Sequence, residues 1–176
     1  MLRESSHASW LGSLSSAISE LTCEYKRVTL IGFSMGGLIC ANFAHLPVID
    51  KIIFINTPIY FWNLKIIIGD VIRGVINRDY GKISYYKKSV GGASAKSGID
   101  FLRILASSKR ILKNVRKPAL VIQCKRDESV NFRSAKYIKN KIGVNAELRY
   151  YDGGCHQVFG CAELRDLICA DIYAFI

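Results

Sequence analysis

One serine of this chain has the surroundings of a catalytic nucleophile. Ser34 lies in the sequence Gly32-Phe33-Ser34-Met35-Gly36. An apolar run, Val28 to Ile31, precedes this sequence, and a helix-like run, Leu38 to His45, follows it. A G-x-S-x-G sequence between a strand and a helix is typical of a nucleophile elbow. The turn is strained, and we expect a Cβ at Gly32 or Gly36 to clash with neighbouring backbone. The alternative is that this serine and its glycines serve ordinary turn chemistry.

Two further residues could complete a catalytic triad with Ser34. Asp127 follows Pro118 to Cys124, which reads as a short buried strand, and His156 follows Glu147 to Tyr151, which reads as another. The chain order serine, acid, histidine matches the order in which hydrolases with this elbow arrange their triads. The other histidines are expected to be exposed or to cap helices: His7 and His45.

The triad chemistry explains why these residue types are needed. A serine hydroxyl is a poor nucleophile unless a base takes its proton, so His156 would act as base during attack and as acid towards the leaving group. Asp127 would fix the tautomer of the ring and stabilise the imidazolium. Asp152 lies on the same turn as His156 and ranks well below Asp127 as the acid, while Glu128 reads as a solvated neighbour.

The elements that must position the triad indicate an α/β fold. Apolar residues at helical spacing precede the elbow: Trp10, Leu14, Ala17, Ile18 and Leu21. Four parallel strands flanked by helices are expected at Arg27–Phe33, Lys51–Ile55, Ala119–Cys124 and Glu147–Tyr151. Because 57–115 is too long for a simple connection, we predict that it is a helical cap inserted into a core of 1–56 and 116–176.

Three motifs resemble one known family. They are Gly32 to Gly37, Gln123 to Glu128 and Gly154 to His156, and the ending Asp171 to Phe175 is also similar to the last helix of that family. From about Trp10 to Ile176 the chain resembles small bacterial carboxylesterases of the monoacylglycerol-lipase-like group of α/β-hydrolases. The resemblance implies hydrolysis of small-molecule carboxylic esters with Ser34 acylated, no metal and no organic cofactor.

The chain departs from this family before the elbow. The resemblance leads us to expect an early His-Gly segment whose loop supplies one oxyanion N–H, and nothing before Ser34 resembles it. The donor that follows the nucleophile, the N–H of Met35, is retained. Activity would then be impaired, and the alternative is a truncated, non-catalytic remnant or one fragment of a split hydrolase. The elbow strand would end the sheet as an apolar edge, which favours a homodimer or a partner fragment covering Val28, Leu30 and Ile31.

The predicted cap has two parts. Ile59 to Ile68 is apolar and aromatic, too short for a membrane span, and is expected to form a helix. Its aromatic residues would line an acyl pocket or pack against the sheet: Tyr60, Phe61 and Trp62. Arg78 to Gly98 is polar and basic, as in a mobile lid.

Composition narrows the remaining functions. The formal charge of +11 concentrates in and after the cap, which fits an anionic membrane surface or acidic substrate, or simply a solvated face. No nucleic-acid module accompanies it, so no nucleic-acid partner is expected. The six cysteines form no CxxC pair and no secretory signal is visible, so a cytoplasmic protein with reduced thiols is the default. If a secretory leader is missing from the sequence, Cys155 and Cys161 could form a disulfide bridge. A zinc site on Cys155, His156 and Cys161 is another alternative, but a fourth ligand is not evident.

Overall fold

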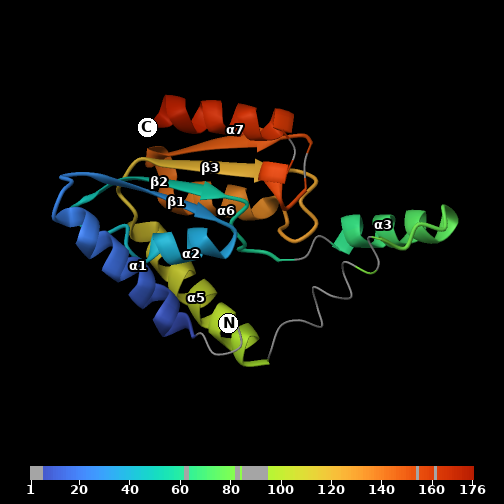
Figure 1. Cartoon of the computed structure of the whole chain (residues 1–176), viewed down its shortest axis with the longest axis horizontal. Helices are drawn as coiled ribbons and strands as arrows, with labels where there is room; N and C mark the ends of the chain where they lie inside the picture. The colour runs from blue at the N-terminus through green and yellow to red at the C-terminus, as the bar shows by residue number, and fades with distance from the viewer. Residues whose placement is uncertain (1–5, 62–63, 82–83, 85–94, 154, 161) are drawn as a thin grey trace.

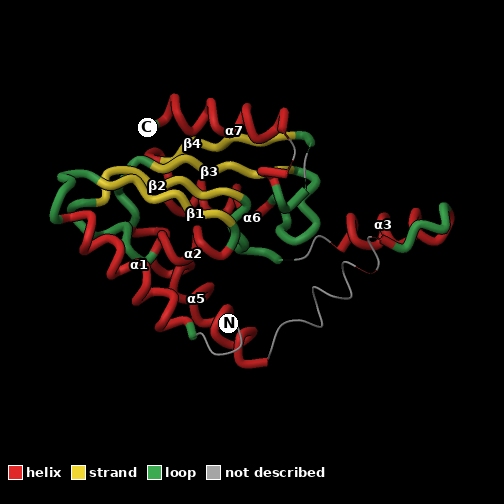
Figure 2. Tube along the Cα trace, in the orientation of Figure 1, coloured by secondary structure: helices red, strands yellow, loops and turns green. Residues whose placement is uncertain are grey.

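A parallel sheet forms the centre of the computed structural model, which describes residues 6–61, 64–81, 84, 95–153, 155–160 and 162–176. Its strands follow one another in the order β1-β2-β3-β4 (Figure 2). Their bounds are Val28–Phe33 (β1), Ile49–Ile55 (β2), Ala119–Cys124 (β3) and Ala146–Tyr151 (β4). The four strands predicted from the sequence, and their parallel pairing, are confirmed.

Helices cover both faces of the sheet. Their bounds are His7–Thr22 (α1), Met35–Ala41 (α2), Leu64–Ile76 (α3), Ala95–Ile111 (α5), Arg133–Ile142 (α6) and Ala162–Phe175 (α7), with 3₁₀ turns at Leu112–Asn114 (η1), Gly143–Asn145 (η2) and Val158–Gly160 (η3). Figure 1 shows α7 on one face, and α1, α2, α5 and α6 on the other. The helix expected from Trp10 to Leu21 is α1, whereas α2 ends at Ala41, four residues before His45.

Alternate residues of the strands enter two separate hydrophobic clusters. In β2, Ile52 and Phe54 pack with residues of α1, α2, α5 and α6, whereas Ile53 and Ile55 pack with residues of α7. A strand covered on both faces needs apolar residues on both, which is why Ile52 to Ile55 of β2 and Ala119 to Ile122 of β3 are continuous hydrophobic runs rather than alternating ones. The sheet is therefore the middle layer of three.

Strand β1 is one edge of this sheet, as predicted. Among the described residues it pairs with β2 alone. The expected apolar edge is smaller than the sequence suggested, because Val28 and Leu30 are buried in the cluster that α1 joins. Ile31 points to the opposite face and is 49% exposed. Of the three residues predicted to present this edge, only Ile31 does so.

The cap helix begins later than the sequence suggested. Residues 59–61 are not helical, because Tyr60 accepts a backbone hydrogen bond from Asn131 at 2.9 Å and Phe61 forms an isolated bridge with Val130. Helix α3 follows and lies apart from the sheet, beyond the carboxyl ends of its strands (Figure 1). None of the described helices is both long and apolar enough to cross a membrane.

The later part of the 57–115 insertion joins the helical layer. Helix α5 packs on α1 and α2, and the Ser108 hydroxyl donates to the Leu38 carbonyl at 2.8 Å. Most of the lid expected from Arg78 to Gly98 lies outside the described residues. The division of the chain into core and cap stays a prediction.

Candidate active site

Ser34 occupies a sharp turn at the carboxyl end of β1. Its backbone has φ 52° and ψ −126°, in the region that residues with a side chain rarely adopt. The Ser34 N–H donates to the Ile55 carbonyl at 2.8 Å, which extends the β1–β2 ladder to the serine itself, and α2 begins at the next residue. The predicted sequence of strand, turn and helix is confirmed.

Two glycines permit this turn, and only one of them, Gly32, is among the two predicted. A Cβ on Gly32 would lie 2.4 Å from the Gly37 Cα, so the predicted clash is confirmed there. A Cβ on Gly36 would meet nothing within 4 Å, so the prediction for Gly36 is wrong. The second close approach is made by Gly37, where a Cβ would lie 1.9 Å from Thr57 Oγ1. Helix α2 thus approaches the end of β2 through Gly37, while Gly36 faces open space.

Asp127 lies in the turn after β3 and is fully buried. Its Oδ1 accepts the backbone N–H groups of Ser129 and Val130, each at 2.8 Å. These bonds fix the carboxylate and leave Oδ2 to face the imidazole of His156, whose Nδ1 lies 2.8 Å away.

His156 joins the acid to the serine. Its Nε2 lies 2.9 Å from Ser34 Oγ, and the Phe33 ring lies against its ring with centroids 5.2 Å apart. An ionised carboxylate only accepts hydrogen bonds, so this geometry suits the tautomer that carries its proton on Nδ1 and leaves Nε2 to accept the Ser34 hydroxyl proton. Three residues from separate loops at the carboxyl edge of the sheet therefore form one continuous hydrogen-bonded chain.

The neighbouring acids behave differently from one another. The Asp152 side chain is 87% exposed and pairs with Lys125 at 2.6 Å, so it does not compete for His156. Glu128 is not the solvated neighbour we expected, because its Oε2 accepts the His156 N–H at 3.1 Å.

Asn56 is a contact residue that the sequence analysis missed. It directly follows β2, and its Nδ2 donates to the His156 carbonyl at 3.2 Å. The available signal was a polar amide placed immediately after the apolar run Ile52 to Ile55.

The family models that were searched do not match this chain, but solved structures do resemble it. The monoacylglycerol lipase of Paleococcus ferrophilus aligns with 96% of this chain and 74% of its own at 15% identity and a TM-score of 0.70. A metagenome-derived lipolytic enzyme aligns with 99% of this chain and 74% of its own at 19% identity and a TM-score of 0.74. The chain has the α/β-hydrolase fold. A meta-cleavage product hydrolase from Pseudomonas fluorescens shares that fold, at 16% identity and a TM-score of 0.66 over 98% of this chain and 72% of its own.

The Met35 N–H follows Ser34 directly at the turn. Met35 is the first residue of α2, and the first N–H groups of a helix have no acceptor within the helix. Such a group can donate to an anion that forms next to Ser34. Its role as the oxyanion donor stays a prediction.

The residues predicted to bind the acyl group pack against other parts of the helical layer. The Tyr60 ring lies edge-on to Tyr137 of α6, with centroids 5.8 Å apart, and Lys109 Nζ lies 5.6 Å from its centre. Phe61 meets Phe101 of α5 in the same edge-on way at 5.8 Å. Trp62 lies outside the described residues. Contact of these aromatic rings with a substrate stays a prediction.

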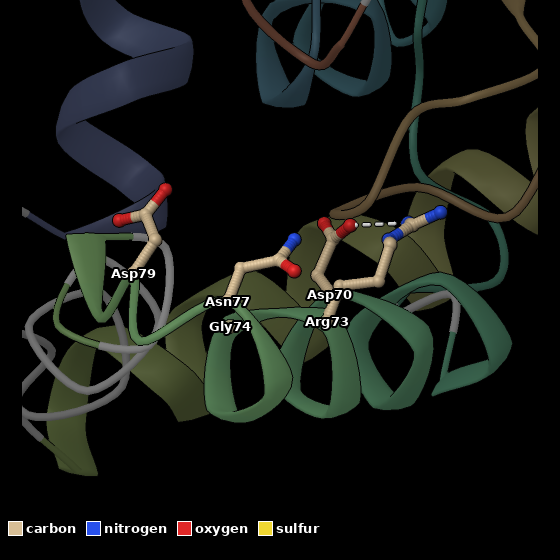
Figure 3. Close-up of a pocket in the computed structure, with 5 residues that line it drawn as sticks. All are labelled: Asp70, Arg73, Gly74, Asn77 and Asp79. Carbon is tan, nitrogen blue, oxygen red and sulfur yellow. Dashed lines mark hydrogen bonds and ion pairs between the residues drawn. The ribbon is translucent and has the colours of Figure 1, made fainter.

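A cavity of about 180 Å³ on α3 is separate from the triad. Figure 3 shows the residues that line it: Asp70, Arg73, Gly74, Asn77 and Asp79. Among them, Asp70 Oδ1 accepts a hydrogen bond from Arg73 at 2.6 Å. No three His, Cys, Asp or Glu side chains within the described part of the chain are grouped to hold a metal. Cys161, which the zinc and disulfide alternatives require, lies outside it.

Proposed function

We propose that this protein is a serine hydrolase that cleaves carboxylic esters of small or medium acyl chains through an acyl-enzyme intermediate. The observation that carries the proposal is the hydrogen-bonded chain from Ser34 through His156 to Asp127, with distances of 2.9 and 2.8 Å. Distances in this range allow a proton to move from the hydroxyl to the imidazole as the serine attacks.

In the proposed reaction, Ser34 Oγ attacks the ester carbonyl while His156 Nε2 takes its proton. The Asp127 carboxylate stabilises the imidazolium that forms, and the Met35 N–H donates to the carbonyl oxygen as it becomes negative. The imidazolium then returns the proton to the departing alcohol, which leaves an acyl group on Ser34. Water activated by the same imidazole releases the acid and restores the hydroxyl.

The choice of esters rests on the lipolytic neighbours, and the fold alone does not make it. The meta-cleavage product hydrolase among the neighbours illustrates that one fold hosts several reactions. Thioesters, acyl transfer and aminopeptidase action are therefore the competing chemistries. Met35 is the oxyanion donor that we propose, and loss of such a donor lowers turnover by about 100- to 1000-fold.

A substrate panel tests the reaction class. p-Nitrophenyl esters from acetate to laurate, matched thioesters and aminoacyl anilides should be compared, with Ser34→Ala as the control variant. We expect hydrolysis of the shorter esters that Ser34→Ala abolishes. Cleavage of anilides or thioesters in preference to esters would contradict ester hydrolysis, and a folded protein inert towards every substrate would favour the non-catalytic alternative.

A further inference from the structure

The main chain of His156 is held on both sides by side chains from other loops. Its N–H donates to Glu128 Oε2 at 3.1 Å, and its carbonyl accepts from Asn56 Nδ2 at 3.2 Å as well as from the Val158 N–H of its own loop at 2.9 Å. Neither contact involves the imidazole ring. Both polar groups of the His156 peptide backbone are thus bound to side chains that follow different strands.

Asn56 is a rigid anchor at the end of β2. It is fully buried, its N–H donates to the Ile122 carbonyl at 2.9 Å, and its Oδ1 accepts the Cys124 N–H at 2.9 Å. Its φ of 45° lies in the left-handed region, which asparagine tolerates better than most residues. Three hydrogen bonds therefore connect β2, β3 and the histidine loop through one side chain and its peptide.

Glu128 connects the acid loop to the histidine loop. It directly follows Asp127, so the loop that orients the imidazole through the Asp127 carboxylate also binds the His156 N–H. The Asp127 contact reaches the His156 ring and the Glu128 contact reaches the His156 backbone, and both come from one loop. Together they constrain the direction in which the His156 side chain leaves the main chain.

We propose that Asn56 and Glu128 are positioning residues that clamp the main chain of His156, so that its ring stays in line between Asp127 and Ser34. The inference rests on the proposed function. His156 lies between β4 and η3, outside regular helix or strand, and Gly153 precedes it in the same connection. Such a segment needs specific bonds to hold a side chain to within a fraction of an ångström, and a displacement of about 1 Å can cost about 100-fold in rate.

Three variants test the clamp. Asn56→Gly removes the amide, and with it the bonds to both His156 and Cys124, yet retains access to the positive φ. Glu128→Ala removes the acceptor at a half-buried position, and Glu128→Gln retains an acceptor oxygen without the charge. Asp152→Ala is the matched control, because it alters an exposed side chain in the same connection.

Two readouts are needed, one of which does not depend on activity. Hydrogen exchange by NMR reports protection of the His156 amide, and the Nδ1 proton resonance reports its bond to Asp127. The rate at which a fluorophosphonate modifies Ser34 reports alignment of the base, and ester kinetics separate kcat from KM. Far-UV circular dichroism establishes that each variant is folded.

We expect Glu128→Ala to expose the His156 amide to exchange and to slow phosphonylation by about 10-fold, as for loss of one hydrogen bond. Asn56→Gly should slow it by about 100-fold through misalignment of the ring. The losses should fall on kcat with KM unchanged, Glu128→Gln should recover most of the rate, and Asp152→Ala should match the wild type.

The clamp is overturned if folded Asn56→Gly and Glu128→Ala react as fast as wild type, or if amide protection at His156 survives in Glu128→Ala. Failure of the proposed function is distinguishable from this result. If the wild-type protein itself does not react with the phosphonate, the hydrolase assignment fails, while the exchange and Nδ1 resonance measurements still decide whether the clamp exists.

Discussion

Replacement of Gly32 and of Gly36 by alanine should have opposite consequences, although the two residues flank Ser34 symmetrically. A Cβ on Gly32 would lie 2.4 Å from Gly37 Cα and 2.7 Å from the carbonyl carbon of Gly36. Ordinary contacts between carbon atoms are about 3.5–4.0 Å, so the turn would have to open by about 1 Å or more. Both obstructing atoms belong to the backbone and cannot rotate away.

The expected magnitude follows from this obstruction. Overpacking costs about 1–3 kcal/mol, and we expect about 3 kcal/mol for Gly32→Ala because the clash is with backbone. Gly36→Ala meets open space within α2. Because alanine favours helix over glycine by up to about 1 kcal/mol, this variant should be as stable as the wild type or slightly more stable.

Urea denaturation followed by far-UV circular dichroism measures the difference. With an m-value of about 2 kcal/mol per molar urea, Gly32→Ala should lower the midpoint by about 1.5 M. Phosphonylation of Ser34 should also slow in Gly32→Ala, because the turn that holds the nucleophile has moved. Equal midpoints for the two variants, or a larger loss in Gly36→Ala, would refute the assignment of the close approach to Gly32.

Three further predictions concern other parts of the molecule. A hydrogen bond from His7, which we had expected to be exposed or capping, and one from Arg103 hold the pKa of Asp100 below its usual 3.8. This stabilisation of the folded state is present above pH 3.8 and is lost as the pH falls through the lowered pKa. Asp100→Asn should therefore reduce Tm at neutral pH but hardly at all well below pH 3.8. An equal reduction of Tm at both pH values would contradict this prediction. Burial raises the pKa of the Cys40 thiol to about 11. Alkylation at pH 8, mapped by mass spectrometry, should therefore modify the exposed cysteines and leave Cys40 unmodified. Early modification of Cys40 would contradict its burial. We expect a second copy of the chain to cover the β1 edge. Light scattering should then give a dimer for the wild type and a monomer for Ile31→Lys. A monomeric wild type with slow amide exchange along β1 would contradict this dimer.

The strands, and the meeting of three polar side chains at their ends, could be predicted because the signals are local. An apolar run of strand length followed by a glycine-bounded serine, or by a carboxylate in a polar turn, identifies both an element and the residue at its carboxyl end. Parallel strands bring those ends to one edge of the sheet, so the chain order of Ser34, Asp127 and His156 was sufficient to expect their meeting.

The supporting contacts could not be predicted because they depend on three-dimensional approach. Which glycine lacks room for a Cβ depends on where α2 passes β2, and this assigned the second close approach to Gly37 rather than Gly36. Glu128 and Asn56 read as a solvated acid and a loop amide until the histidine loop folds between them. The start of α3 was placed too early because the bonds that hold Tyr60 come from residues 70 or more positions later in the chain.

The most direct test of the central claim is reaction with a fluorophosphonate probe, read by mass spectrometry of the digested protein. A serine activated by the His156–Asp127 pair should form a covalent adduct on the peptide that contains Ser34, and Ser34→Ala should form none. An unlabelled folded wild type, or equal labelling of wild type and Ser34→Ala, would contradict the assignment of Ser34 as the nucleophile.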